Sequence, residues 1–166
     1  MSTPAEWAEG YARQARADYE TWEKLQASKV HECHKLLFLQ MACEKLTKAH
    51  LCRSGSDPRD LQSSHAYIAK NLPIIVRQQM LRRGMKSQSA AWIDKPVKYL
   101  AQEIELLAPA VRRGGQRHDN CEYPWEDAGE TLHVPLDWTF VPSSLLTAQA
   151  GRTFLKLVRE AIDHYA

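Results

Sequence analysis

The stretch from Lys29 to Cys52 dominates the hydrophobic pattern of this chain. It contains no Gly or Pro, and its apolar residues cover more than one face of a helix. A helix that is apolar most of the way round is usually buried by neighbours on several sides. The pattern therefore predicts the central helix of a bundle. Replacing Phe38 by Ala should cost about 3–5 kcal/mol if that side chain is fully buried.

Three other segments repeat apolar residues in steps of three and four, which is typical of amphipathic helices. The first covers roughly residues 5–27 and opens with a capping box between Thr3 and Glu6. The second begins near Asp94, and the third opens at Pro142. Their apolar stripes supply faces that can pack around the central helix.

The segment 53–64 is rich in Gly, Pro and Ser and predicts a loop. The helix that follows begins around His65. Because Pro73 removes a backbone donor, we expect this helix to be short or kinked, with a continuation from Asn71 that ends at Gly84. Together these elements predict an all-α fold, an up-and-down bundle of about five helices that forms a single domain over the whole chain.

No helical period survives between residues 112 and 141. A long irregular stretch inside a compact domain is commonly functional or bound to a partner. Its large aromatic side chains indicate that it packs rather than hangs free. We therefore expect a homodimer or a component of a protein complex, with an interaction segment that includes Tyr123, Trp125, Trp138 and Phe140.

The composition of the 166 residues, 44% hydrophobic and 25% charged, is that of a soluble globular protein. The longest uninterrupted apolar run, 36–39, is far shorter than the roughly 20 residues of a membrane span. The N-terminal residues lack the basic start and apolar core of a signal peptide. These observations predict a cytoplasmic protein that does not enter a membrane.

Three of the four cysteines, Cys33, Cys43 and Cys52, lie on the predicted central helix. Neighbouring ones would be about 14 Å apart along the axis, too far for a disulfide, so we expect reduced thiols. The chain has no C-x-x-C pair and no glycine-rich phosphate loop of the G-x-x-x-x-G-K type. We therefore expect no metal site and no cofactor.

The net charge of +2 conceals a strong asymmetry along the chain. Residues 70–117 hold ten basic and three acidic side chains, whereas residues 118–166 hold three basic and eight acidic ones. A basic block of this kind can bind phosphate groups. The alternative is a solvated surface whose charge the acidic third compensates.

Several motifs together resemble the HEPN family (higher eukaryotes and prokaryotes nucleotide-binding). The first predicted helix has an aromatic-rich opening and carries Asp18. Residues 40–49, QMACEKLTKA, are similar to the family's Q-x-x-x-E-K-x-x-K-A signature, and residues 64–68, SHAYI, resemble its T-H-D-L element. Residues 122–125, EYPW, resemble its R-Y-P-D element. The chain departs from the pattern at Ala66, Glu122 and Trp125, and by a long insertion before the last helix.

This resemblance implies a five-helix bundle that commonly dimerises. Many members are metal-independent endoribonucleases of toxin or defence systems, with an Arg followed by four to six residues and a His from each of two subunits. The matching residues here are Arg112, Arg113 and His118. In such sites the His moves a proton and the Arg stabilises charge on the phosphoryl group. Here, however, the spacing runs across Gly114 and Gly115, whereas active members place the pair on a helix.

The alternative function is a non-catalytic HEPN module that binds a nucleotide, RNA or a partner protein. Its candidate phosphate contacts are His65, at a predicted helix N-terminus, and the basic residues Arg82, Arg83 and Arg117. A structural role for His65, supporting the corner before its helix, is the competing interpretation. Glu44 and Lys45 likewise suit a structural ion pair at the edge of a buried helix.

Overall fold

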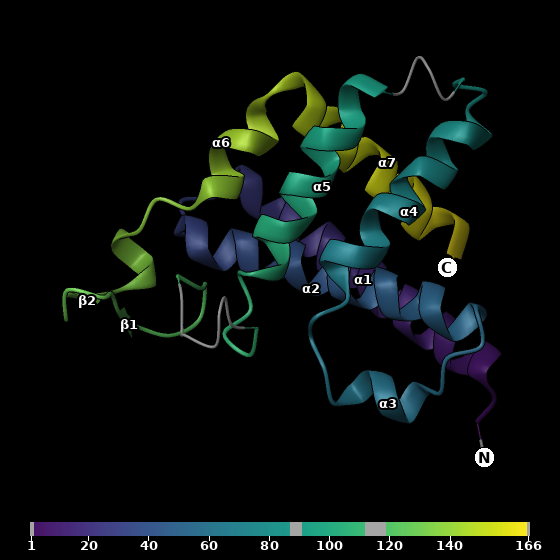
Figure 1. Cartoon of the computed structure of the whole chain (residues 1–166), viewed down its shortest axis with the longest axis horizontal. Coiled ribbons are helices and arrows are strands. Elements are labelled where there is room, and N and C mark those ends of the chain that lie inside the picture. The colour runs from purple at the N-terminus through teal and green to yellow at the C-terminus, as the bar shows by residue number, and fades with distance from the viewer. Residues whose placement is uncertain (1, 87–90, 112–118, 166) are drawn as a thin grey trace.

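The computed structural model describes residues 2–86, 91–111 and 119–165. The described residues are mainly helical, and the only sheet among them is a hairpin of two short strands. Five long helices form the body of the molecule, with the short helices α3 (Pro58–Gln62) and α6 (Val141–Thr147) beside them (Figure 1). The prediction of an all-α bundle is confirmed. None of the described helices is long and apolar enough to cross a membrane.

The helices α1 (Pro4–Gln26) and α2 (Glu32–Arg53) form the most extensive helix pair in the molecule. At the start of α1, Thr3 and Glu6 make the predicted capping box. The face of α1 that meets α2 carries small side chains, which let the two backbones approach closely. These buried residues include Ala8, Ala12 and Ala15.

The central position predicted for α2 is confirmed, because it packs against α1, α4 (Ile68–Arg82), α5 (Ala91–Glu105) and α7 (Gln149–Tyr165). The Phe38 side chain is only partly buried, so the condition for a large loss of stability on its removal is not met. Phe38 is offset around the helix from the fully buried positions and packs at the edge of the core. The fully buried side chains of α2 include Leu36, Leu39, Ala42, Cys43, Leu46 and Ala49.

The helix α4 continues through Pro73 over 15 residues, so it is not the short helix that was one of the two expectations. Asn71 does not cap a second helix, because its backbone N–H and its side-chain amide both donate to the Tyr67 carbonyl, at 3.1 and 2.8 Å. Pro73 removes only one donor, and that donor would have met a carbonyl in the first turn. As predicted, α4 ends just before Gly84, which has a φ of +75°.

The predicted loop at 53–64 contains the additional short helix α3. Asp57 caps it by accepting a hydrogen bond from the backbone N–H of Arg59 at 2.9 Å, and Pro58 occupies the first helical position. Gly55 has a φ of +94°, which suits its place just after the end of α2.

The single last helix predicted from Pro142 is in fact two helices, α6 and α7. The chain is extended at Ala148 between them, with ψ at 162°. The backbone of α6 lies so close to α7 that a Cβ on Gly151 would overlap the Leu145 carbonyl oxygen. The absence of a side chain at Gly151 therefore permits the close approach of the two helices.

The segment before α6 was expected to be irregular, but it contains a small antiparallel hairpin. Strand β1 (Trp125–Glu126) pairs with β2 (Leu132–His133), and the short 3-10 helix η2 (Pro135–Asp137) follows. The hairpin stands at one end of the molecule, beyond the ends of the long helices (Figure 1). Phe140, at the end of this segment, enters the main core with 1% of its surface exposed.

Candidate functional site

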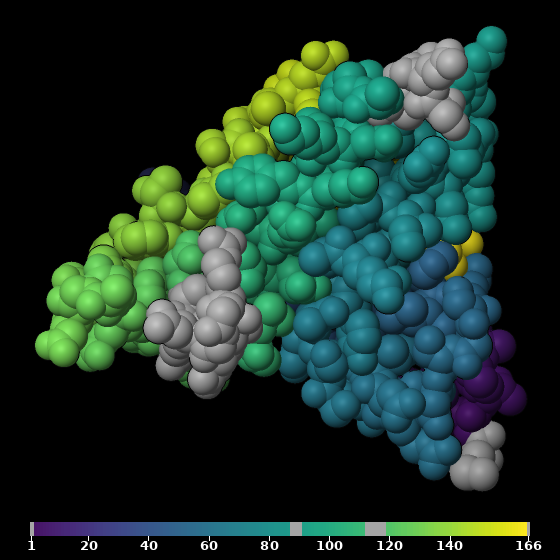
Figure 2. All heavy atoms as spheres, in the orientation of Figure 1, coloured from purple at the N-terminus to yellow at the C-terminus, as the bar shows by residue number. Residues whose placement is uncertain are grey.

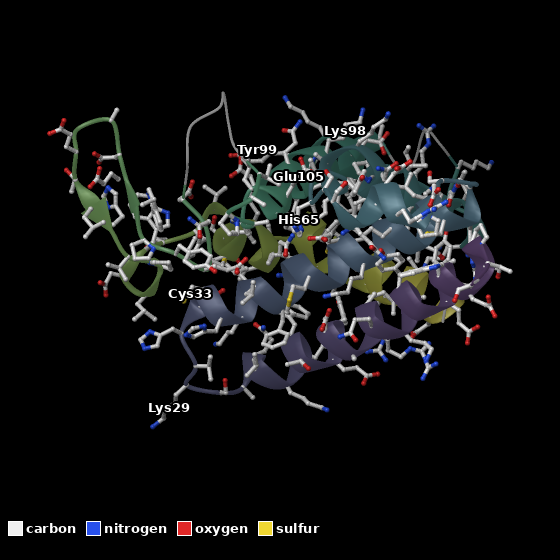
Figure 3. All side chains as sticks on the ribbon, turned by 90° about the horizontal axis from the view of Figure 1, so that it is seen from below. Lys29, Cys33, His65, Lys98, Tyr99 and Glu105 are labelled. Carbon is white, nitrogen blue, oxygen red and sulfur yellow. The ribbon has the colours of Figure 1, made fainter. Side chains whose placement is uncertain are left out.

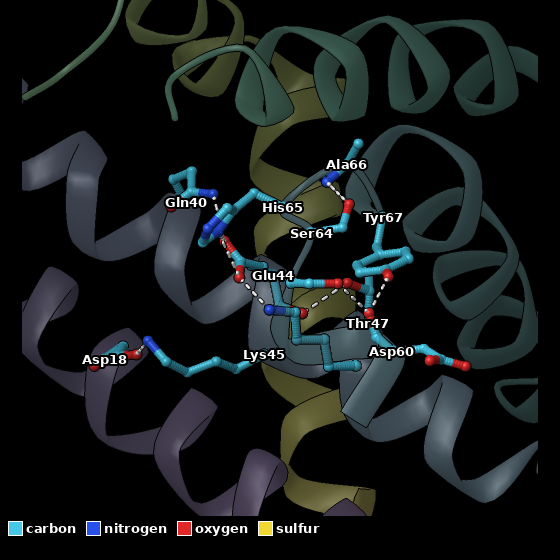
Figure 4. A network of polar contacts seen from close by, with 12 residues as sticks. Asp18, Gln40, Glu44, Lys45, Thr47, Asp60, Ser64, His65, Ala66 and Tyr67 are labelled. Carbon is cyan, nitrogen blue, oxygen red and sulfur yellow. Dashed lines mark hydrogen bonds and ion pairs between the residues drawn. The ribbon is translucent and has the colours of Figure 1, made fainter. Parts of the chain in front are cut away.

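A buried carboxylate on α2 gathers polar residues of the Q-x-x-x-E-K-x-x-K-A motif (Figure 4). The Glu44 carboxylate accepts a hydrogen bond from Gln40 Nε2 at 3.0 Å and pairs with Lys48 Nζ at 2.7 Å. His65 Nδ1 lies 3.1 Å from both carboxylate oxygens. Gln40, Glu44 and Lys48 share one helix face because they are spaced by four residues. His65 joins them from the loop before α4.

The Glu44–Lys48 pair is a buried ion pair. Only 11% of the Glu44 side chain and 6% of the Lys48 side chain are exposed. Burial by itself raises the pKa of Glu44, but the hydrogen bonds from Lys48, His65 and Gln40 outweigh it, so the pKa lies below its usual value. Glu44 is therefore ionised at neutral pH and its charge is balanced inside the protein.

Lys45 forms a separate link between α2 and α1. Its Nζ lies 2.5 Å from a carboxylate oxygen of Asp18, and Gln14 Nε2 donates to the other oxygen at 3.0 Å. Both signature charges, Glu44 and Lys45, thus have internal partners, as the structural interpretation predicts. A pocket of about 420 Å³ next to Lys45 is lined by Trp7, Tyr11 and Gln14, among others.

The structure places His65 three residues before α4 rather than at the helix N-terminus. The Glu105 carboxylate occupies that end of α4 and accepts a hydrogen bond from the backbone N–H of Ala69 at 2.9 Å. Burial raises the pKa of Glu105. Because a carboxylate already meets the helix N-terminus, the backbone donors predicted to assist His65 in holding a phosphate are not open to one. The imidazole nevertheless remains 45% exposed.

The candidate arginines have different surroundings. Arg82 is exposed on the last turn of α4. Arg83 pairs with Glu160 of α7, so its charge is already compensated. The remaining predicted cations and the proposed catalytic histidine, Arg112, Arg113, Arg117 and His118, lie outside the described residues.

The outer surface of α4 and α5 combines basic and apolar side chains, and we call it the α4–α5 face. The two helices lie side by side and their outward surfaces fill much of the view in Figure 2. A small groove of about 110 Å³ between them is lined by Arg77, Asp94 and Lys98, among others. Figure 3 shows Lys98 on the side of the molecule that carries His65. The exposed residues of this face are Lys70, Ile74, Arg77, Leu81, Trp92, Lys95, Lys98 and Tyr99.

The cations of this face were predicted from the sequence, but its aromatic residues were not. Trp92 and Tyr99 are 48% and 46% exposed. The signal was present in the sequence, because both fall outside the apolar stripe that α5 buries through Val97, Leu100 and Ile104. Large exposed apolar patches are a common mark of interaction sites.

The predicted interaction segment is divided between core and surface. Trp125 and Phe140 are 5% and 1% exposed, so neither ring is available to a partner in this conformation. Tyr123 and Trp138 are 54% and 36% exposed. Trp138 packs edge-on against both Trp125 and His133, with ring centroids 5.3 and 4.9 Å apart. The exposed Trp138 ring is thus held by a packed aromatic cluster.

All four cysteines are buried free thiols. Burial raises the pKa of each, to about 12 for Cys43, so none is a reactive thiolate at neutral pH. Across residues 2–86, 91–111 and 119–165, no group of three His, Cys, Asp or Glu side chains could hold a metal ion. The described surface therefore offers charged side chains, exposed aromatic rings and several exposed imidazoles, among them His31, His34, His65 and His164, rather than a reactive thiol.

Comparisons with protein-family models, with curated proteins and with solved structures found no match to this chain.

Proposed function

We propose that this protein is a HEPN-like module that binds RNA through the α4–α5 face. The observation that carries the proposal is the presence of exposed cations on the adjacent helices α4 and α5 together with two exposed aromatic rings on α5. Cations neutralise the phosphate backbone, and aromatic rings stack on unpaired bases. The face offers Lys95 and Lys98 for the first role, and Trp92 and Tyr99 for the second.

The HEPN-like part of the proposal is supported by the way the signature residues meet. Glu44 and Lys48 of the Q-x-x-x-E-K-x-x-K-A motif and His65 of the Ser-His element form one hydrogen-bonded group. The two motifs lie in separate segments, so their contact gives a structural reason for the pattern. In this interpretation the signature holds the corner between α2 and α4 and thereby positions the α4–α5 face.

The first test is RNA binding at several salt concentrations. Replacing Arg77, Lys95 and Lys98 by Ala should weaken binding and flatten the dependence of log K on log salt by roughly one unit per lost phosphate contact. Fluorescence anisotropy with a labelled single-stranded RNA measures both effects. Replacement of three exposed cations on the α1 side changes the net charge equally and serves as the control. These are Arg13, Lys24 and Lys29, the last of which Figure 3 shows far from Lys98.

Equal losses in the two triple variants would show that binding follows net charge rather than the α4–α5 face. Binding without any salt dependence, or no binding at all, would mean that the basic residues form only a solvated surface, and the proposal would fail.

The ribonuclease form of the proposal concerns the Arg112/Arg113–His118 pair and is tested separately. Incubation of the purified protein with total RNA should give cleavage that EDTA does not prevent. His118→Ala should abolish that cleavage and leave binding nearly intact, because a proton-transfer residue acts mainly in the transition state. Gel analysis of the RNA measures cleavage. Binding without cleavage by the unmodified protein would leave the non-catalytic module as the function.

A further inference from the structure

The segment from Asp119 to Thr139, which we call the acidic arm, contains Asp and Glu side chains but no Lys or Arg. No Lys or Arg occurs between Asp119 and Gly151. In a chain with 22 basic residues, such a gap gives the arm a net negative charge. Its carboxylates are Asp119, Glu122, Glu126, Asp127, Glu130 and Asp137.

The arm also exposes large apolar side chains. Leu132 and Leu136 are 63% and 48% exposed, and they accompany the exposed rings of Tyr123 and Trp138. Large apolar side chains exposed together on one segment are a common mark of an interaction surface.

The arm is ordered by contacts of its own. The Asp127 carboxylate accepts hydrogen bonds from the backbone N–H groups of Gly129 and Thr131, at 2.9 and 3.0 Å, and His133 Nε2 lies 2.9 Å from its other oxygen. Asn120 Oδ1 accepts hydrogen bonds from the backbone N–H groups of Glu122 and Tyr123. A preformed element loses little conformational freedom when it binds.

The α4–α5 face carries positive charge where the acidic arm carries negative charge. It presents Lys70, Arg77, Lys95 and Lys98 together with exposed apolar side chains. Within one molecule, however, the arm stands at the end of the molecule opposite α4 (Figure 1). The basic surface that the arm matches is therefore available to it on another copy of the chain.

We infer that the acidic arm of one copy docks onto the α4–α5 face of a second copy. The carboxylates of the arm meet the cations of the face, and the apolar side chains of both surfaces bury one another. A contact between two different surfaces either closes reciprocally in a two-fold dimer or repeats from copy to copy. The inference does not depend on RNA binding, although RNA and the arm would compete for the same cations.

The test is charge reversal with complementation, on protein freed of nucleic acid. An arm variant carries Glu126→Lys and Glu130→Lys, whose side chains are exposed on the hairpin, and a face variant carries Lys95→Glu and Lys98→Glu. Each variant alone removes the attraction at the substituted positions and places like charges there, whereas a mixture of the two variants again opposes Lys and Glu at those positions. Sedimentation velocity in low-salt buffer should show the unmodified protein above its 19.0 kDa monomer mass, each variant as a monomer, and the mixture again above it.

Matched controls carry the same charge changes on α1, α3 and the turn after α1. Glu9→Lys with Asp60→Lys, and Lys24→Glu with Lys29→Glu, should both associate like the unmodified protein. Recovery of association in the mixture also shows that the two variants are folded. A monomer at every concentration, association that persists in either variant alone, or a mixture that stays monomeric would each overturn the inference.

Discussion

Replacing Glu44 by Ala should lower the free energy of unfolding by about 3–5 kcal/mol, the range found when one partner of a buried ion pair is removed. The substitution leaves the Lys48 ammonium, only 6% exposed, without its counter-charge. Gln40 and His65 lose their shared acceptor at the same time. Urea denaturation at neutral pH measures the loss.

The same carboxylate gives the stability a defined pH dependence. The pKa of Glu44 is lower in the folded protein than its usual 4.5. Its contribution to the free energy of unfolding is therefore present above pH 4.5 and is lost as the pH falls through the pKa of the folded protein. The difference in stability between the unmodified protein and Glu44→Gln should therefore shrink as the solution is acidified. Exposed carboxylates with lowered pKa values, such as Asp127, are common to both proteins and cancel in this difference.

Glu105 supplies a control of opposite sign. Burial raises the pKa of Glu105, so folding favours the protonated carboxyl. The free energy of unfolding of the unmodified protein should therefore rise relative to that of Glu105→Gln as the solution is acidified.

A loss below about 1 kcal/mol for Glu44→Ala, which is typical of exposed ion pairs, would contradict a stabilising role for the buried Glu44–Lys48 pair.

Replacing Phe140 by Ala should cost about 3–5 kcal/mol, the usual range for a fully buried Phe. The ring is 1% exposed and belongs to the main core, where it anchors the end of the acidic arm. Phe38→Ala is the matched control, because the same atoms are removed from a partly buried site and should cost clearly less. Thermal and urea denaturation of both variants give the comparison. Equal losses would mean that Phe140 is no better buried than Phe38.

Helices with a regular apolar stripe could be predicted from the sequence, because their burial pattern repeats locally. The capping box at Thr3 and the stripe through Val97 and Leu100 are examples. The break between α6 and α7 could not be predicted in this way. It depends on the close approach that Gly151 permits, which is a contact between elements. The hairpin at 125–133 was missed because strands of two residues are too short to show a period.

The candidate site was predictable to a similar extent. The spacing of Gln40, Glu44 and Lys48 places them on one helix face, but the arrival of His65 depends on the path of the chain through α3. The basic block was visible in the sequence as a count of charges. Which cations remain available is a tertiary property, as the pairing of Arg83 with Glu160 from α7 shows.

The four buried thiols can serve as probes of local opening of the structure. Along α2, Cys33 lies near the beginning, Cys43 near the middle and Cys52 near the end. Cys121 lies at the start of the acidic arm. Each is at most 3% exposed, so an alkylating reagent reaches it only when the surrounding structure opens. The labelling rate at each cysteine, followed by mass spectrometry, therefore reports the local opening free energy at that point. The native cysteines therefore allow the order in which parts of the structure open to be measured without introducing further probes.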